Sequence, residues 1–242
     1  MSDLATYESG AQPARARLAG SRWVTEILVP GTGVPGTDPE LLELFLIHFC
    51  SLGVLMTEPA EGWIRRAGER CAAVGLEELG AALIKHSKQE AGHHLLMIND
   101  TRALVARRRL QGRTLLDSEA LLSRAPTPGI QRYIKLHEDV IAGPAPFAQI
   151  AIEFEIERMS MIYGPRFIER CQERLGPDIK NCLSFVEDHA ALDVGHTKFN
   201  AAQLSRLLEA RPEFLPDLVL AGAEALDAYS AFFTDCIALA QH

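Results

Sequence analysis

Apolar residues recur along most of the chain at the spacing of amphipathic helices, and no segment has the alternation typical of a strand. The clearest stretch follows Asp38 and Pro39, a typical pair for the N-cap and first position of a helix, and reads LLELFLIHFCSLGVLM over residues 41–56. This segment is too rich in Leu, Phe and Met to face water on any side. We therefore expect a central core helix there.

Several other segments have the same helical spacing and are separated by proline and glycine. Seven or eight helices without a strand predict an all-α bundle, formed as a single domain over residues 38–242. The first 37 residues contain three prolines and five glycines with little periodicity, so we expect an arm or loop lying over that domain. The expected helices after the first cover about 63–74, 76–109, 130–141, 148–163, 179–210 and the residues after Pro212.

Composition limits the classes of function. A net charge of −8 argues against binding to a nucleic-acid backbone, and the basic run at 107–109 fits a solvated helix end. No stretch approaches the roughly 20 apolar residues of a membrane span, and no signal-peptide pattern opens the chain, so we expect a cytoplasmic protein without a membrane partner. The five cysteines form no CxxC pair and predict reduced, buried thiols.

One polar stripe stands out within the predicted helix over 179–210. Asp193 and His196 lie about 40° and about 20° from His189 around a helix, so the three side chains share one face. Phe185 and Phe199 indicate that this helix is buried, and buried imidazoles beside a carboxylate require partners or a metal ion. A solvated His and Asp face or a salt-bridge network is the alternative for this motif alone.

Two further segments carry matching residue types. Glu90 and His93 have the i, i+3 spacing of carboxylate and imidazole ligands in helical bundles. Glu157 lies in a strongly apolar helix where it can bridge two cations, with Glu153 one turn earlier as its alternative. Such oxygen and imidazole ligands suit iron or manganese, which the sequence does not distinguish.

The other polar residues near these motifs receive secondary roles. His86 lies two turns before His93 on the same face and is the substitute ligand if the expected register is wrong. Asp100 is placed to accept a hydrogen bond from His93 and orient its ring. His48 and His94 are expected to be structural or to contact the ligands without binding the metal themselves.

These motifs resemble the heme-oxygenase-like di-iron oxidases, a family of iron-containing redox enzymes. The similarity lies in QEAGHHLLMIND at 89–100, in Glu157-Arg158-Met159-Ser160, and in HAALDVGHT at 189–197. It implies a heme-oxygenase-like bundle of about seven helices and no bound haem. Some members have the first carboxylate at the position that His86 occupies here. The ligands that the resemblance implies for two metal ions are Glu90, His93, Glu157, His189, Asp193 and His196, with Glu153 and His86 as alternatives.

The resemblance implies an enzyme that uses two ferrous ions and dioxygen to desaturate, cleave or N-oxygenate a small molecule in specialised metabolism. An amino acid is the expected substrate, by family analogy, with Arg132, Arg158 or Arg166 as partners for its carboxylate. A homodimer would be unsurprising. Two alternatives are a metal-independent thiaminase-like hydrolase with a cysteine nucleophile and a glutamate, and a non-catalytic helical metal-binding protein.

Overall fold

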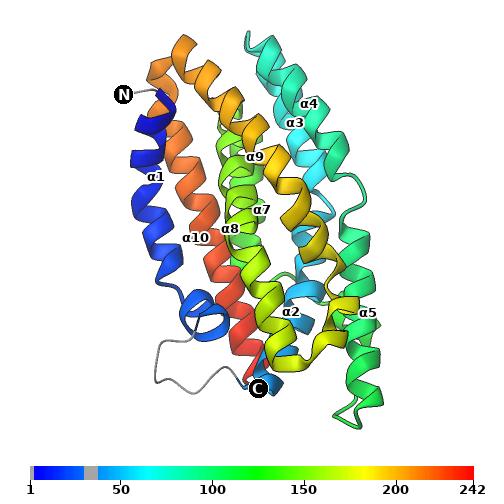
Figure 1. The fold of residues 1–242 in the computed structure, drawn as a ribbon. Helices are drawn as coiled ribbons and strands as arrows, with labels where there is room; N and C mark the ends of the chain where they lie inside the picture. The colour runs from blue at the N-terminus through cyan, green and yellow to red at the C-terminus, as the bar shows by residue number, and fades with distance from the viewer. Residues whose placement is uncertain (1–2, 30–37) are drawn as a thin grey trace.

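The computed structural model describes residues 3–29 and 38–242, which contain α-helices, short 3-10 and π turns, and no strand. The all-α prediction is confirmed, although the described residues form more helices than expected and α8 continues to Leu175, past the expected end at residue 163. Figure 1 shows the long helices as a bundle, with α1 alongside α10 and the α3–α4 pair at the opposite side. The elements are α1 (Asp3–Ala19), η1 (Trp23–Leu28), α2 (Pro39–Thr57), α3 (Ala60–Ala73), α4 (Glu77–Glu90), α5 (His94–Leu110), α6 (Ser118–Leu122), α7 (Pro128–Ala142), η2 (Pro146–Ala148), α8 (Gln149–Leu175), η3 (Pro177–Cys182), α9 (Ser184–Ala210), η4 (Pro212–Phe214) and α10 (Leu215–Ala240).

Helix α2 is the central core helix that the sequence predicts. Asp38 caps it by accepting a hydrogen bond from the Glu40 amide at 3.0 Å, and Pro39 occupies its first turn. The stretch Pro39–Ala73 is long and apolar enough to cross a membrane, contrary to the expectation that no segment is, but 72% of its most apolar window is buried in the protein. Its apolar surface is therefore used in the core.

Helices α3 and α4 cross at very close range because glycines face each other. A Cβ built on Gly68 would lie 2.8 Å from the Gly80 carbonyl oxygen, and one built on Gly80 would lie 2.6 Å from that of Gly68. Only residues without a side chain allow the two backbones to approach in this way. The contact fixes α4, which carries the first candidate ligands, against α3.

The prediction of a single helix over residues 76–109 is wrong in one respect. The structure has two helices there, separated by a break at residues 91–93. Helix α4 ends at Glu90, and α5 begins at His94. Gly92 has a φ of +88°, a conformation that glycine adopts without strain and that stops an α-helix. Glu90 and His93 therefore flank a helix break instead of sharing one helical face.

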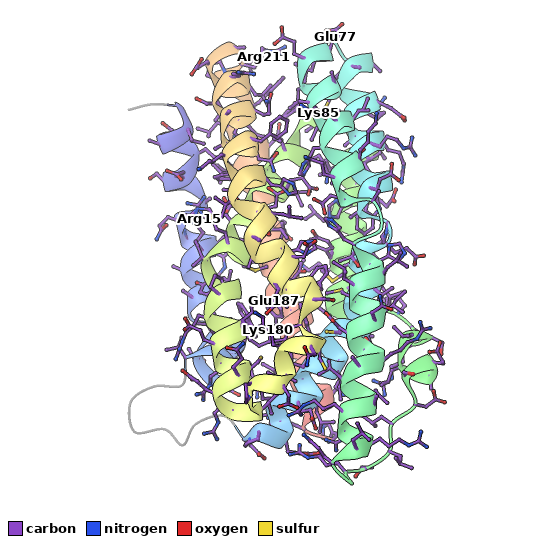
Figure 2. The ribbon with its side chains drawn as sticks, turned by 45° about the vertical axis from the view of Figure 1, so that its right-hand side comes forward. Arg15, Glu77, Lys85, Lys180, Glu187 and Arg211 are labelled. Atoms are coloured by element: carbon purple, nitrogen blue, oxygen red, sulfur yellow. The ribbon has the colours of Figure 1, made fainter. Side chains whose placement is uncertain are left out.

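Helices α8 and α9 form a long hairpin across the bundle, joined by η3. Figure 2 shows Lys180 and Glu187 near the beginning of α9, and Arg211 past its other end, at the same end of the bundle as Glu77 on α4. Helix α9 therefore runs antiparallel to α4. The middle of α9 faces the end of α4, where the helix break lies.

The N-terminal segment, expected as an arm or loop, contains helix α1 and the π turn η1. Tyr7 and Arg15 of α1 both bind the buried Glu155 of α8, at 3.0 Å and 2.6 Å. Trp23 of η1 is 5% exposed and stacks on Phe233 of α10. Residues 30–37 of the expected arm lie outside the described residues.

The basic run at 107–109 is not a fully solvated helix end. Arg108 is 4% exposed and binds Glu43 of α2 at 2.8 Å, and Arg107 binds the same carboxylate at 2.7 Å. Because Glu43 is completely buried, it requires these cations. The cluster joins α2 to α5 at the C-terminal end of α5.

Candidate metal centre

Three parts of the fold bring the candidate ligands together. Helix α4 and the break that follows supply His86, Glu90 and His93, and α8 supplies Glu157. Helix α9 supplies the stripe that its periodicity predicts, His189, Asp193 and His196. Of the described residues, two groups hold their ligand atoms within 4.8 Å of one another, as a metal ion requires.

The first group consists of His86, Glu90, Glu157 and His196. His86 Nε2 lies 2.9 Å from Glu157 Oε1, and His196 Nδ1 lies 3.6 Å from the same oxygen. His86 is completely buried. The residue that sequence analysis kept as a substitute therefore lies inside the cluster.

The second group consists of Glu90, His93 and His189. His93 Nδ1 lies 3.0 Å from Glu90 Oε2, and His189 Nε2 lies 4.0 Å from that oxygen. The other oxygen, Oε1, lies 3.5 Å from His196 Nδ1 of the first group. Glu90 thus directs one oxygen to each group, which is the geometry of a carboxylate bridging two cations. The sequence had suggested Glu157 for that bridging role.

Several buried polar atoms of the cluster lack a hydrogen-bond partner among the described residues. His86 Nε2 and Glu157 Oε1 are close enough to bond, yet neither is aligned for a hydrogen bond. Buried polar atoms without partners are rare and costly in folded proteins. A cation bound between them would satisfy these atoms, and their nitrogen and oxygen chemistry suits iron or manganese. The atoms without partners are both ring nitrogens of His86, Glu157 Oε1, Asp193 Oδ2 and His196 Nδ1.

Neighbouring groups orient two of the candidate ligands. His189 Nδ1 lies 2.9 Å from the Phe185 carbonyl oxygen, and because a carbonyl only accepts, Nδ1 carries the proton and Nε2 keeps its lone pair. Asn200 donates to Glu157 Oε2 at 2.5 Å and leaves Oε1 facing the two histidines. Such outer partners are typical of metal sites. Sequence analysis missed Asn200, although it lies one helical turn after His196.

At two candidate ligands, Glu90 and His189, the surroundings favour the protonation state that binds a metal ion. Burial opposes the ionisation of Glu90, but the hydrogen bond with His93 and the neighbouring imidazoles leave its pKa below the usual value. Burial lowers the pKa of His189, which keeps this ring neutral. Burial and the charge of Asp193 raise the pKa of Glu157 well above its usual value. A cation bound beside this carboxylate would favour its ionised form.

Glu153 and Asp193 lie beside the two groups without belonging to either. The Gln149 amide donates to Glu153 at 2.5 Å, and burial raises the pKa of Glu153 to about 8. Glu157 is accordingly the α8 carboxylate that the geometry favours. Asp193 is almost completely buried, and its Oδ1 lies 3.6 Å from His196 Nδ1.

The expected role of Asp100 as the partner of His93 is wrong. Its carboxylate accepts hydrogen bonds from the Ser184 amide at 3.0 Å and from the Phe185 amide at 2.9 Å. Asp100 therefore caps the beginning of α9, where free amides and the helix dipole favour a negative charge. It acts on the helix that carries the ligands instead of on a ligand.

A cavity of about 90 Å³ opens beside the second group. Glu90 and His189 form part of its wall, together with Tyr133, Glu153 and Tyr229. The centre therefore borders an internal space that a small molecule can enter.

A solved structure has the same fold as this chain. It is a domain of unknown function from Shewanella denitrificans, described as having a heme oxygenase-like fold, with a TM-score of 0.67 and 16% sequence identity over 95% of this chain and 89% of that one. At this identity the similarity shows the fold alone, and the heme-oxygenase-like fold predicted from the motifs is confirmed. No protein-family model and no curated protein matches the chain.

Proposed function

We propose that this protein is a dioxygen-dependent oxidase that binds two non-haem iron ions and oxidises a small organic substrate. The observation that supports it most directly is the position of Glu90, which directs one oxygen to each of two groups of potential ligands. His86, Glu157 and His196 would complete one ion's site, and His93 and His189 the other. Asp193 is placed to join the first site.

Two bound ferrous ions would supply two of the four electrons that reduce dioxygen to water, the substrate supplying the other two and an external reductant restoring the ions. The chain's own residues hold the site in place. The Phe185 carbonyl fixes the ring of His189, and Asn200 fixes Glu157. The cavity beside Glu90 and His189 would admit the substrate.

A cysteine nucleophile, as in the thiaminase-like alternative, has little support. All five cysteines are buried and free. Burial raises the pKa of Cys71 to about 12 and that of Cys182 to about 11. Thiols with such pKa values carry almost no thiolate at neutral pH.

The test is oxygen uptake by protein reconstituted anaerobically with ferrous iron. We expect the wild type to consume dioxygen as its ferrous ions are oxidised, and His189→Ala to bind less iron and consume correspondingly less. His94→Ala is the matched control, since His94 belongs to neither group of ligands.

Three results separate the candidate functions. Iron binding with oxygen uptake supports the oxidase. Iron binding without oxygen uptake would favour the non-catalytic metal-binding protein. Negligible iron in wild type and variants alike would refute the metal centre.

A further inference from the structure

A second cavity, of about 60 Å³, adjoins the cavity at the metal centre. The two share part of their walls, including His189, so the second cavity reaches the candidate centre from one side. Helices α8, α9 and α10 supply this common wall. The residues that line both cavities are Met159, Ser160, Phe185, His189 and Tyr229.

The wall of the second cavity is mainly aromatic. Trp23 stacks on Phe233 with ring centres 4.2 Å apart, and its edge contacts Tyr163 at 5.3 Å. Phe185 continues this wall, and its ring centre lies 3.9 Å from that of His189. Aromatic side chains therefore extend from η1 to a candidate metal ligand, and a ring or alkyl group would be in contact with them throughout.

No lysine or arginine lines either cavity in the part of the chain that the structure describes. Of the arginines expected to hold a substrate carboxylate, Arg132 binds Glu224 at 2.7 Å and Arg166 binds Glu169 at 3.0 Å, both at the surface. Arg158 lines a different, open hollow beside α1. The wall of the first cavity includes acidic side chains that could face an ammonium, but neither cavity offers a cationic side chain to the carboxylate of a free amino acid, and burying that carboxylate without one is costly.

We infer that the reacting part of the substrate is an uncharged apolar group about the size of a benzene ring, held in the two adjoining cavities beside His189. The size follows from the combined volume of the two adjoining cavities, which matches the roughly 150 Å³ of a protein cavity known to bind benzene. This inference rests on the proposed function for the oxidation itself. It replaces the amino acid that family analogy suggested.

The test follows the binding of fluorobenzene by fluorine NMR. Protein loaded anaerobically with ferrous iron is compared with zinc-loaded protein, and the metal content of each sample is measured. We expect saturable binding in both, with faster fluorine relaxation in the iron protein because the paramagnetic ions lie near the probe. Toluene should displace fluorobenzene at concentrations where L-phenylalanine and L-lysine do not.

Two substitutions on α9 provide a matched pair. Val186 lines the aromatic cavity and is 7% exposed, so Val186→Phe fills the space and should weaken fluorobenzene binding at least tenfold. Val194 is 43% exposed on the same helix, and Val194→Phe should bind the probe as the wild type does. If Val186→Phe does not fold, Ser160→Leu on α8 takes its place, because Ser160 lines both cavities and a leucine there would fill the same space.

The outcomes distinguish the two proposals. The substrate inference is overturned if iron loads but fluorobenzene does not bind. It is also overturned if Val186→Phe and Ser160→Leu bind fluorobenzene as tightly as the wild type does. Displacement by L-phenylalanine at lower concentration than toluene would overturn it as well. If no iron loads and fluorobenzene still binds in the cavity, the proposed oxidase fails while the apolar ligand site stands.

Discussion

Glu90 is the residue on which the candidate centre depends most. Its carboxylate is the member common to both groups of potential ligands, with Oε2 3.0 Å from His93 and Oε1 3.5 Å from His196. Each of the other members of these two groups belongs to one group only. Loss of the Glu90 charge should therefore affect both ions, whereas loss of His189 should affect mainly one.

A pair of isosteric substitutions tests this role. Glu90→Gln removes one negative charge and half of the bridging oxygen atoms, so we expect ferrous iron to fall from about two ions per chain to less than one. Glu153→Gln is the control, because Glu153 already accepts a hydrogen bond from Gln149 and, with a pKa of about 8, is mostly protonated at neutral pH. Iron analysis after desalting is the measurement. Equal iron content in the two variants would contradict the bridging role.

Sequence periodicity predicts the relative placement of residues on one helix, but not contacts between helices. His189, Asp193 and His196 lie on one face of α9 as their spacing predicts. The position of His86 beside Glu157 depends on how α4 packs against α8, and their sequence separation of 71 residues gives no register. The six ligands assigned by resemblance remain a prediction about metal binding.

At the scale of elements, the break between α4 and α5 and the cap of α9 shape the centre. Gly92 is visible in the sequence as a possible helix end, but the apolar periodicity on both sides of it predicted a continuous helix. In the structure its φ is +88°, and the helix ends there. Asp100 could not be assigned from sequence, because it lies on α5 and caps α9, 84 residues later. Both devices act at helix ends, where periodicity carries little information.

Substitution of Asp100 tests the role of the cap at the beginning of α9. Asp100→Ala leaves the Ser184 and Phe185 amides without their acceptor, and we expect a loss of about 1–2 kcal/mol in unfolding free energy. Ferrous iron should also bind more weakly, because Phe185 orients His189. Chemical denaturation and iron titration are the measurements.

Asp117→Ala provides the comparison for this substitution. Asp117 caps the short, surface helix α6 through the Glu119 amide at 2.9 Å. Its loss should lower stability without changing iron affinity. If both variants weaken iron binding equally, the cap on α9 has no special connection to the centre.

At the scale of the whole molecule, composition and periodicity were enough to predict an all-helical bundle. They could not predict that α1 packs against the core, because Pro13 and the nearby glycines obscure its pattern. Nor could they place the carboxylates that bind Arg108, which are Glu40 and Glu43 of α2. Long-range ion pairs depend on the packing of helices, which local sequence does not contain.

Two buried histidines give the fold a predictable dependence on pH. Burial lowers the pKa values of His48 and His137 to about 4, whereas an unfolded histidine titrates near 6.5. The unfolded chain therefore binds more protons between these values, so stability is fully present above about pH 6.5 and is lost as the pH falls toward 4.

His137→Phe should make this pH dependence shallower. Phenylalanine keeps an aromatic ring against Trp63, on which His137 stacks at 4.2 Å, and cannot take up a proton. Denaturant midpoints measured with a chelator from pH 7 to pH 4 provide the test. His242→Phe, at the exposed C-terminus, should follow the wild type. An unchanged slope in His137→Phe would contradict the assigned cause.

The central claim is that two metal ions bind on either side of Glu90. Anomalous diffraction at the iron absorption edge, from crystals loaded anaerobically with ferrous iron, tests it most directly. We expect two peaks about 3.5–4 Å apart, one beside His86, Glu157 and His196 and one beside His93 and His189, with a Glu90 oxygen toward each. A single peak, or no iron between these side chains, would contradict it.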